Sequence, residues 1–123
     1  MITPASLNLP IYQGSTFFKR FIWKENRQNP TDISGYTFQM QIRKDVDSDI
    51  VIAEFSSATG EFTIEDAAAG AFVLEIEPTI TRDMTFTEAV YDIECTYPDE
   101  RISRIIEGFV VLSKEVTRST TSP

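Results

Sequence analysis

The chain has 123 residues, of which 41% are hydrophobic and 24% are charged, and its formal net charge is −8. This length and composition predict one globular domain, covering residues 1–123, and exclude a disordered chain. The acidic charge and the absence of any basic run argue against a nucleic-acid partner, since that affinity depends mainly on cation–phosphate contacts.

The ends of the chain show no sign of export or of a membrane anchor. The first ten residues, MITPASLNLP, lack the basic start and the apolar segment of a signal peptide. No apolar run approaches the roughly 18 residues that a membrane-spanning helix needs. We therefore expect a protein that is made in the cytoplasm and has no membrane partner.

The first predicted strand covers residues 6–12. Leu7, Leu9 and Ile11 alternate along it and share one side. Because a proline inside the segment cannot donate to a neighbouring strand, we expect an edge strand or an extended arm. We assign residues 1–9 to an N-terminal arm and treat the three apolar side chains as candidate contacts with other proteins.

The second predicted strand, within residues 15–24, is apolar on both faces. Phe17, Phe21 and Trp23 share one face, which Lys19 interrupts. This face is expected to belong to the core. A sugar-stacking platform around Trp23 is the alternative.

The opposite face of the same segment carries Phe18 and Ile22, with Arg20 between them. A strand that is apolar on both faces is either central or has its outer face covered by something else. We therefore predict that these three side chains contact another protein chain.

The third predicted strand, residues 36–43, follows a polar loop and alternates strictly. Tyr36, Phe38, Met40 and Ile42 fall on one face, and polar side chains fall on the other. The apolar face is expected to pack in the core between two sheets, with a ligand groove as the alternative.

The rest of the chain continues the pattern of short strands. Phe62 and Ile64 are expected to face inward, and Gly108 indicates a bulge or a close backbone approach. Further strands are predicted at residues 50–55, 61–65, 71–77, 89–97 and 102–116.

One stretch, residues 78–86, does not read as a strand. It predicts a single helical turn, capped by Thr79 or Thr81 with Asp83 in its first turn. Seven or eight strands spaced about ten residues apart, with almost no helix, predict an all-β fold, either a sandwich or a small barrel.

The sequence argues against an enzyme. It contains no histidine, which excludes triads and dyads built on that residue, and its one cysteine, Cys95, is expected to be a buried thiol. Two carboxylate pairs, Glu75 with Glu77 and Asp92 with Glu94, have a spacing that a glycosidase pair could use. Both are expected on solvated strand faces instead. We predict no catalytic residues and no cofactor.

An acidic loop raises the question of a calcium site. Asp45, Asp47 and Asp49 have the spacing of the first three ligands of a calcium-binding loop. Ile50 stands where the loop needs glycine, and Ser56 stands where it needs a bidentate glutamate. A solvated loop is therefore expected, with incidental cation binding as the alternative, and no metal site is predicted.

Six short motifs follow one another along the chain: YQGSTF (12–17), ISGYTFQMQIR (33–43), GAFVLEI (70–76), TRDM (81–84), YDIE (91–94) and RIIEGFVVLSKEVTR (104–118). In this order, they resemble small structural proteins of tailed bacteriophages, including the N-terminal domain of baseplate upper proteins.

The resemblance implies an immunoglobulin-like antiparallel β-sandwich without catalysis, located in the virion at the tail, baseplate, neck or head. We expect it to bind other virion proteins in multiple copies or as a homo-oligomer. Arg118, at the start of a polar tail that covers residues 117–123, is a further candidate contact. The alternative function is a receptor-binding, carbohydrate-binding or head-decoration module on the virion surface.

Overall fold

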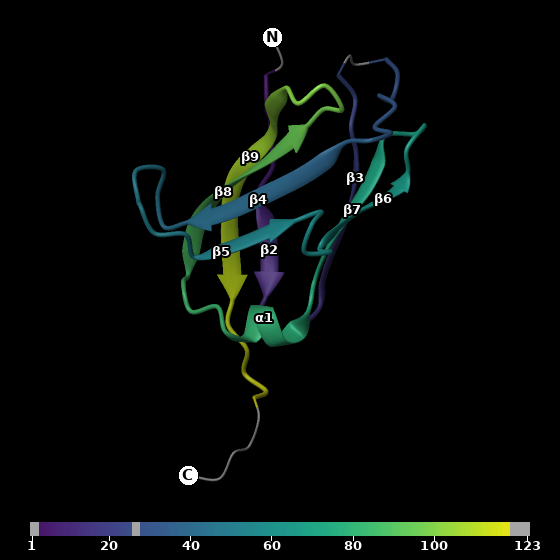
Figure 1. Cartoon of the computed structure of the whole chain (residues 1–123). Coiled ribbons are helices and arrows are strands. Elements are labelled where there is room, and N and C mark those ends of the chain that lie inside the picture. The colour runs from purple at the N-terminus through teal and green to yellow at the C-terminus, as the bar shows by residue number, and fades with distance from the viewer. Residues whose placement is uncertain (1–2, 26–27, 119–123) are drawn as a thin grey trace.

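The computed structural model describes residues 3–25 and 28–118 (Figure 1). Within them it contains strands and a single short helix. The elements are β1 (Ala5–Ser6), β2 (Leu9–Tyr12), β3 (Phe17–Ile22), β4 (Thr37–Arg43), β5 (Ala53–Ser56), β6 (Phe62–Asp66), β7 (Ala71–Ile76), α1 (Pro78–Arg82), β8 (Glu88–Thr96) and β9 (Ile102–Ser113).

The strands form two sheets that pack face to face. Sheet A has the order β1-β9-β8-β4-β5, with β2 as a further partner of β9, and sheet B has the order β3-β7-β6. Among the described strands, β3, β7 and β6 thus form one layer, which lies opposite β4, β8 and β9 of the other layer. This is the arrangement of an immunoglobulin-like sandwich, and it confirms the predicted fold class.

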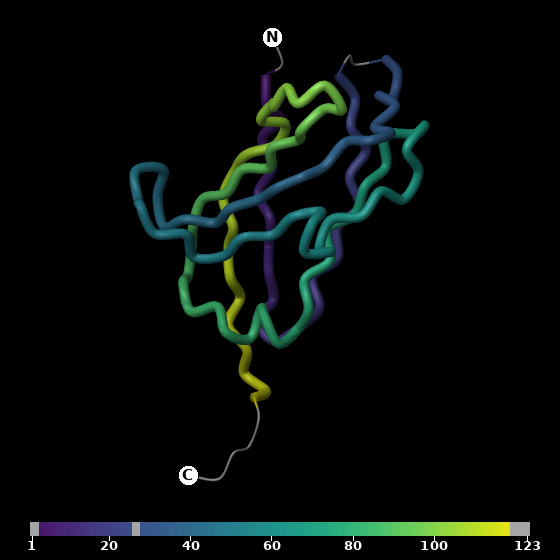
Figure 2. Tube along the Cα trace, in the orientation of Figure 1, coloured from purple at the N-terminus to yellow at the C-terminus, as the bar shows by residue number. Residues whose placement is uncertain are grey.

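One pairing differs from the antiparallel expectation. β1 and β2 run parallel to β9, whereas the other strand pairings of both sheets in the described residues are antiparallel. Figure 2 shows these N-terminal strands (purple) beside the last strand (yellow) along the length of the domain. Sheet A is therefore mixed rather than wholly antiparallel, because the N-terminal segment pairs in parallel with β9, the strand farthest from it in sequence.

The strand predicted for residues 6–12 is divided into two by Asn8. The side-chain oxygen Oδ1 of Asn8 accepts a hydrogen bond from the backbone N–H of Phe109 at 3.0 Å. A side chain thus replaces a backbone acceptor in the ladder at this point, which interrupts the regular pairing. The division raises the number of strands in the described residues above the seven or eight expected.

Aromatic rings from both sheets meet in the centre of the core. Phe38 of sheet A stacks on Phe72 of sheet B with ring centroids 4.1 Å apart and ring planes inclined by 10°. Phe21 stacks on the same Phe72 at 5.0 Å, and Phe62 lies 5.9 Å from Phe38. These contacts hold the two layers together.

The face predicted for residues 36–43 belongs to this core. Phe38, Met40 and Ile42 are buried, and the half-buried Tyr36 stacks on Tyr97 with ring centroids 5.0 Å apart. This confirms the core interpretation of these four side chains over a ligand groove. Alternation along a strand with one buried face was sufficient to predict it.

Two local expectations are wrong. Ile64 is 38% exposed rather than inward, because β6 is an edge strand whose pairing with β7 shifts register after Ile64. The helical turn is not capped by a threonine. It begins after Glu77, which makes no side-chain cap, and Asp83 lies at its C-terminal end.

Thr81 has a structural role inside α1. It is fully buried, donates a hydrogen bond to the backbone oxygen of Ser15 at 2.8 Å and accepts one from the N–H of Gly14 at 3.1 Å. The helix is therefore bonded to the turn between β2 and β3, which ties the connection between the sheets at this end of the molecule.

We expect the substitution Phe72→Ala to lower the free energy of unfolding by about 3–5 kcal/mol, because it removes the ring on which Phe38 and Phe21 stack and leaves a cavity. Urea denaturation followed by circular dichroism measures this loss. Ile50→Ala is the control, since Ile50 is 74% exposed and its truncation opens no cavity. Equal losses in both variants would contradict the central role of Phe72.

The thiol of Cys95 lies in the core opposite Phe38 and is fully buried. Burial raises its pKa to about 11 from an ordinary value of 9.0. The thiol of the unfolded chain therefore loses its proton at lower pH than the folded one. Stability associated with this group is complete below about pH 9 and decreases as the pH rises toward about 11.

We expect Cys95→Ala to reduce the decline in unfolding free energy across this pH window. A two-unit separation corresponds to roughly 2–3 kcal/mol at its upper limit. Urea midpoints of both proteins, measured on either side of the window, test this. The tyrosines titrate in both proteins and cancel in the difference. Parallel curves for the two proteins would show that the thiol does not contribute.

Candidate functional site

The structure divides the predicted contact residues of the N-terminal segment. Leu9 and Ile11 are buried in the core, with exposures of 1% and 0%, and Leu7 is half-buried against it. Pairing of β2 with β9 turns Leu9 and Ile11 into the sandwich. They pack within the chain itself and present no surface to another protein.

The predicted contact residues of β3 and of the tail lie at the surface. Phe18 is 58% exposed and Ile22 is 41% exposed on the outer face of sheet B, with the exposed Arg20 between them. Arg118 is also exposed and lines a hollow with Gln13, Arg82 and Glu115, whereas Phe18, Arg20 and Ile22 do not line it.

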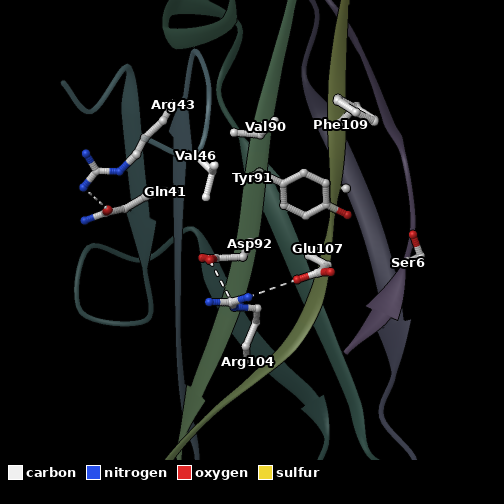
Figure 3. A pocket seen from close by; sticks show the side chains of 11 residues that line it. Ser6, Gln41, Arg43, Val46, Val90, Tyr91, Asp92, Arg104, Glu107 and Phe109 are labelled. Atoms are coloured by element: carbon white, nitrogen blue, oxygen red, sulfur yellow. Dashed lines mark hydrogen bonds and ion pairs between the residues drawn. The ribbon is translucent and has the colours of Figure 1, made fainter. Parts of the chain in front are cut away.

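A hollow of about 510 Å³ lies on the outer face of sheet A. Figure 3 shows Arg104 of β9 between two carboxylates, Asp92 of β8 and Glu107 of β9. Arg104 Nε lies 3.4 Å from Asp92 Oδ2, and Arg104 Nη1 lies 3.2 Å from Glu107 Oε1. Partial burial raises the pKa of Asp92, and the guanidinium of Arg104 opposes that rise.

This charge cluster depends on a bulge that strict alternation does not predict. Residues 104 and 107 of a regular strand would face opposite sides. The pairing of β8 with β9 shifts register between Ile93 and Glu94, and the extra residue, Ile105, is fully buried. Arg104 and Glu107 therefore share the outer face. The sequence predicted a bulge or a close backbone approach at Gly108, and the bulge itself lies three residues earlier, at Ile105.

The cluster is a set of ion pairs in which Arg104 has a carboxylate on either side, so the three charged groups together carry a net charge of −1. Nearby Arg43 donates to the backbone oxygen of Ser48 at 2.7 Å and to Gln41 Oε1 at 2.9 Å (Figure 3). These bonds fix the direction of the side chains around the hollow and give its floor a polar character.

Phe109 and Val90 line this hollow, and further exposed apolar side chains follow them on β2 and β9. Phe109 is 47% exposed, Val111 44% and Tyr12 61%. Phe109 lies opposite Val90, and Val111 opposite Pro10. We call the surface formed by these five residues, from β2, β8 and β9, the sheet A patch.

The acidic positions considered in the sequence differ in exposure, since Asp92 and Glu94 are half-buried rather than fully solvated. Glu75 and Glu77 are exposed, and so are the three aspartates of the loop at 45–49. Within residues 3–25 and 28–118, no group of three or more carboxylate, thiol or imidazole side chains is placed to hold a metal ion. None of the helices in the same residues is long and apolar enough to cross a membrane.

Leu7 helps to hold the N-terminal segment to sheet A, beside the pairing of β1 and β2 with β9. The hydroxyl of Tyr91 donates to the backbone oxygen of Leu7 at 2.5 Å, and the N–H of Leu7 donates to the oxygen of Glu107 at 2.9 Å. At Gly108 a side-chain β-carbon would lie 2.2 Å from the Leu7 oxygen. The glycine thus permits the close backbone approach that its position predicted.

The root of the C-terminal tail is also fixed. The side chain of Gln13 donates to the oxygen of Met84 at 2.8 Å and accepts from the N–H of Glu115 at 2.9 Å. Glu115 Oε1 lies 3.9 Å from Arg82 Nε. These contacts join the tail to α1 and to the β2–β3 turn, so they set the direction in which the chain leaves the sandwich.

Comparison with known proteins gives no assignment. No protein-family model matches the chain, and no curated protein sequence matches it.

We expect Tyr91→Phe to destabilise the protein by about 1 kcal/mol, because the oxygen of Leu7 loses a hydrogen bond in a largely buried place. Amide hydrogen exchange of Leu7 should accelerate more than that of β4. Tyr12→Phe serves as the control, since the Tyr12 side chain is exposed. Unchanged exchange at Leu7 would show that this hydroxyl does not hold the segment.

Proposed function

We propose that the protein is a non-enzymatic structural component of a bacteriophage virion that binds other virion proteins. The observation that carries the protein-binding part is the sheet A patch, where exposed apolar side chains from three strands lie next to one another. Contiguous exposed apolar surface favours contact with another protein. The ion pairs of Arg104 beside it supply the polar rim that is usual for such an interface.

The virion part of the proposal rests on the ordered motifs described above. An immunoglobulin-like sandwich is the fold that the resemblance implies, and the observed topology agrees with it. Because fold alone does not determine function, the topology supports this part without adding to its specificity. The tail, baseplate, neck and head remain the candidate locations within the particle.

The alternative is a receptor-binding, carbohydrate-binding or head-decoration module on the virion surface. Exposed aromatic rings on the loops would favour this alternative. Here the exposed rings of Tyr12, Phe18 and Phe109 lie on strands, and Trp23 is buried at 7% exposure. This placement favours a broad protein contact over a sugar-stacking site.

We expect mass spectrometry of purified phage particles to detect the chain, and Phe109→Lys to lower its incorporation. Phe109 is half-exposed, so the charged side chain should leave the fold intact while it disrupts an apolar contact. Thr63→Lys, at an exposed position on the other sheet, is the matched control.

Three outcomes separate the possibilities. Loss of Phe109→Lys from particles, with normal melting temperature and normal incorporation of Thr63→Lys, supports the proposal. Absence of the unmodified chain from particles contradicts the virion assignment. Normal incorporation of Phe109→Lys together with binding of the chain to a glycan array or to host cells supports the alternative.

A further inference from the structure

β3 is an edge strand that pairs with no other strand than β7 among the described residues. Hollows of about 280 and 340 Å³ lie between β3 and the N-terminal strands β2 and β1. The N–H of Trp23 donates to the oxygen of Gly70 at 2.8 Å. Because successive residues of an antiparallel ladder point their backbone groups to alternate sides, Phe18, Arg20 and Ile22 direct theirs away from β7. The open edge of β3 thus offers three N–H and three C=O groups to a further strand.

The side chains along this edge are arranged symmetrically about Arg20. Phe18 and Ile22 flank it at equal spacing on the same outer face and are 58% and 41% exposed. Arg20 Nε lies 2.5 Å from Glu65 Oε1 on β6. Val73, which is opposite Arg20 in the β3–β7 pairing, is only 5% exposed although it belongs to the same outer face. Arg20 therefore reaches across β7, away from the open edge.

We propose that two copies of the chain pair through β3, antiparallel, about a two-fold axis at Arg20. In this register Phe18 lies opposite Ile22 of the second copy, and Ile22 lies opposite its Phe18. Phe18, Arg20 and Ile22 each form a hydrogen-bonded pair with the residue opposite in the second copy. Each of these three pairs exchanges two backbone hydrogen bonds. The two three-stranded sheets become one continuous sheet with an isologous interface.

The charges of β3 disfavour the neighbouring registers. Registers that keep corresponding faces together differ by two residues. A shift in one direction places Lys19 opposite Lys19 of the second copy and Phe18 opposite Arg20. A shift in the other direction places Ile22 opposite Arg20 and Phe18 opposite Lys24. The register centred on Arg20 is therefore the one that pairs apolar side chains on the outer face and separates the lysines.

The outer face of sheet B is also complementary to itself in charge. Glu75 lies beside Phe18 in the β3–β7 pairing, and Glu77 follows it, so acidic groups gather where β3 begins. Lys24, which is exposed, follows the other end of β3. A two-fold axis through the middle of the strand brings opposite ends together. Lys24 of each copy then approaches the acidic pair of the other.

This inference goes beyond the proposed function, because it concerns association of the chain with itself and does not depend on a virion. It also uses a surface distinct from the sheet A patch. An experiment can therefore contradict one of the two proposals and leave the other unaffected.

Sedimentation equilibrium of the full chain tests the dimer. We expect the unmodified protein to sediment as a dimer, and Ile22→Glu to weaken association by roughly tenfold or more, since it places a carboxylate opposite Phe18 and beside Glu75 of the second copy. Ile64→Glu is the matched control, because Ile64 is 38% exposed against 41% for Ile22 but lies on β6, at the opposite edge of sheet B. Melting temperatures of both variants verify that they fold.

Cross-linking tests the register. In Arg20→Cys the two introduced thiols face each other across the axis, with an expected Cα–Cα distance of about 5.5 Å, which a disulfide spans. Mild oxidation should give a covalent dimer. Thr63→Cys, exposed on the outer face of the same sheet but on β6, should remain uncross-linked. The native Cys95 is buried and does not compete.

Three results would overturn the inference. They are a monomeric unmodified protein at the highest concentration that stays in solution, a dimer that persists unchanged in Ile22→Glu, and cross-linking of Thr63→Cys as fast as that of Arg20→Cys.

Discussion

The stacking of Phe38 on Phe72 is the contact on which the rest of the structure depends, because there a ring of sheet A meets a ring of sheet B. Phe21 and Phe62 extend the stack along sheet B. Such pairs contribute about 0.5–1.5 kcal/mol each beyond the area that they bury. Since side chains alternate along a strand, fixing these rings inward also determines which residues face outward. The exposed surfaces on both sheets follow from this one constraint.

A second constraint decides which strand edge stays open. Gly108 lets the backbone of Leu7 approach β9, and the hydroxyl of Tyr91 bonds the same residue, so the N-terminal segment joins sheet A. The segment precedes β3 directly and is short, so pairing with β9 leaves the edge of β3 uncovered within the described residues. The lack of a side chain at Gly108 in sheet A thus helps to leave the edge of β3 in sheet B unpaired.

Period-two alternation predicted the core face of residues 36–43 and the two-faced character of β3, because both depend only on side-chain direction along one strand. It failed where neighbouring strands matter. Ile11 is inward because β2 pairs with β9, and Ile64 is exposed because β6 lies at an edge. Arg104 and Glu107 share a face only because a bulge inserts Ile105 between them. No local pattern in the sequence marks that bulge.

The sequence by itself determined the all-β class, the positions of most strands and the exposure of Phe18 and Ile22, since these depend on local alternation and composition. Only the tertiary structure decided the parallel pairing of β1 and β2 with β9, the charge cluster around Arg104 and the open edge of β3. The pairing of β1 and β2 with β9 joins residues about a hundred positions apart in the sequence. It is selected by the packing of the whole core and by close approaches such as that at Gly108, which no single segment encodes.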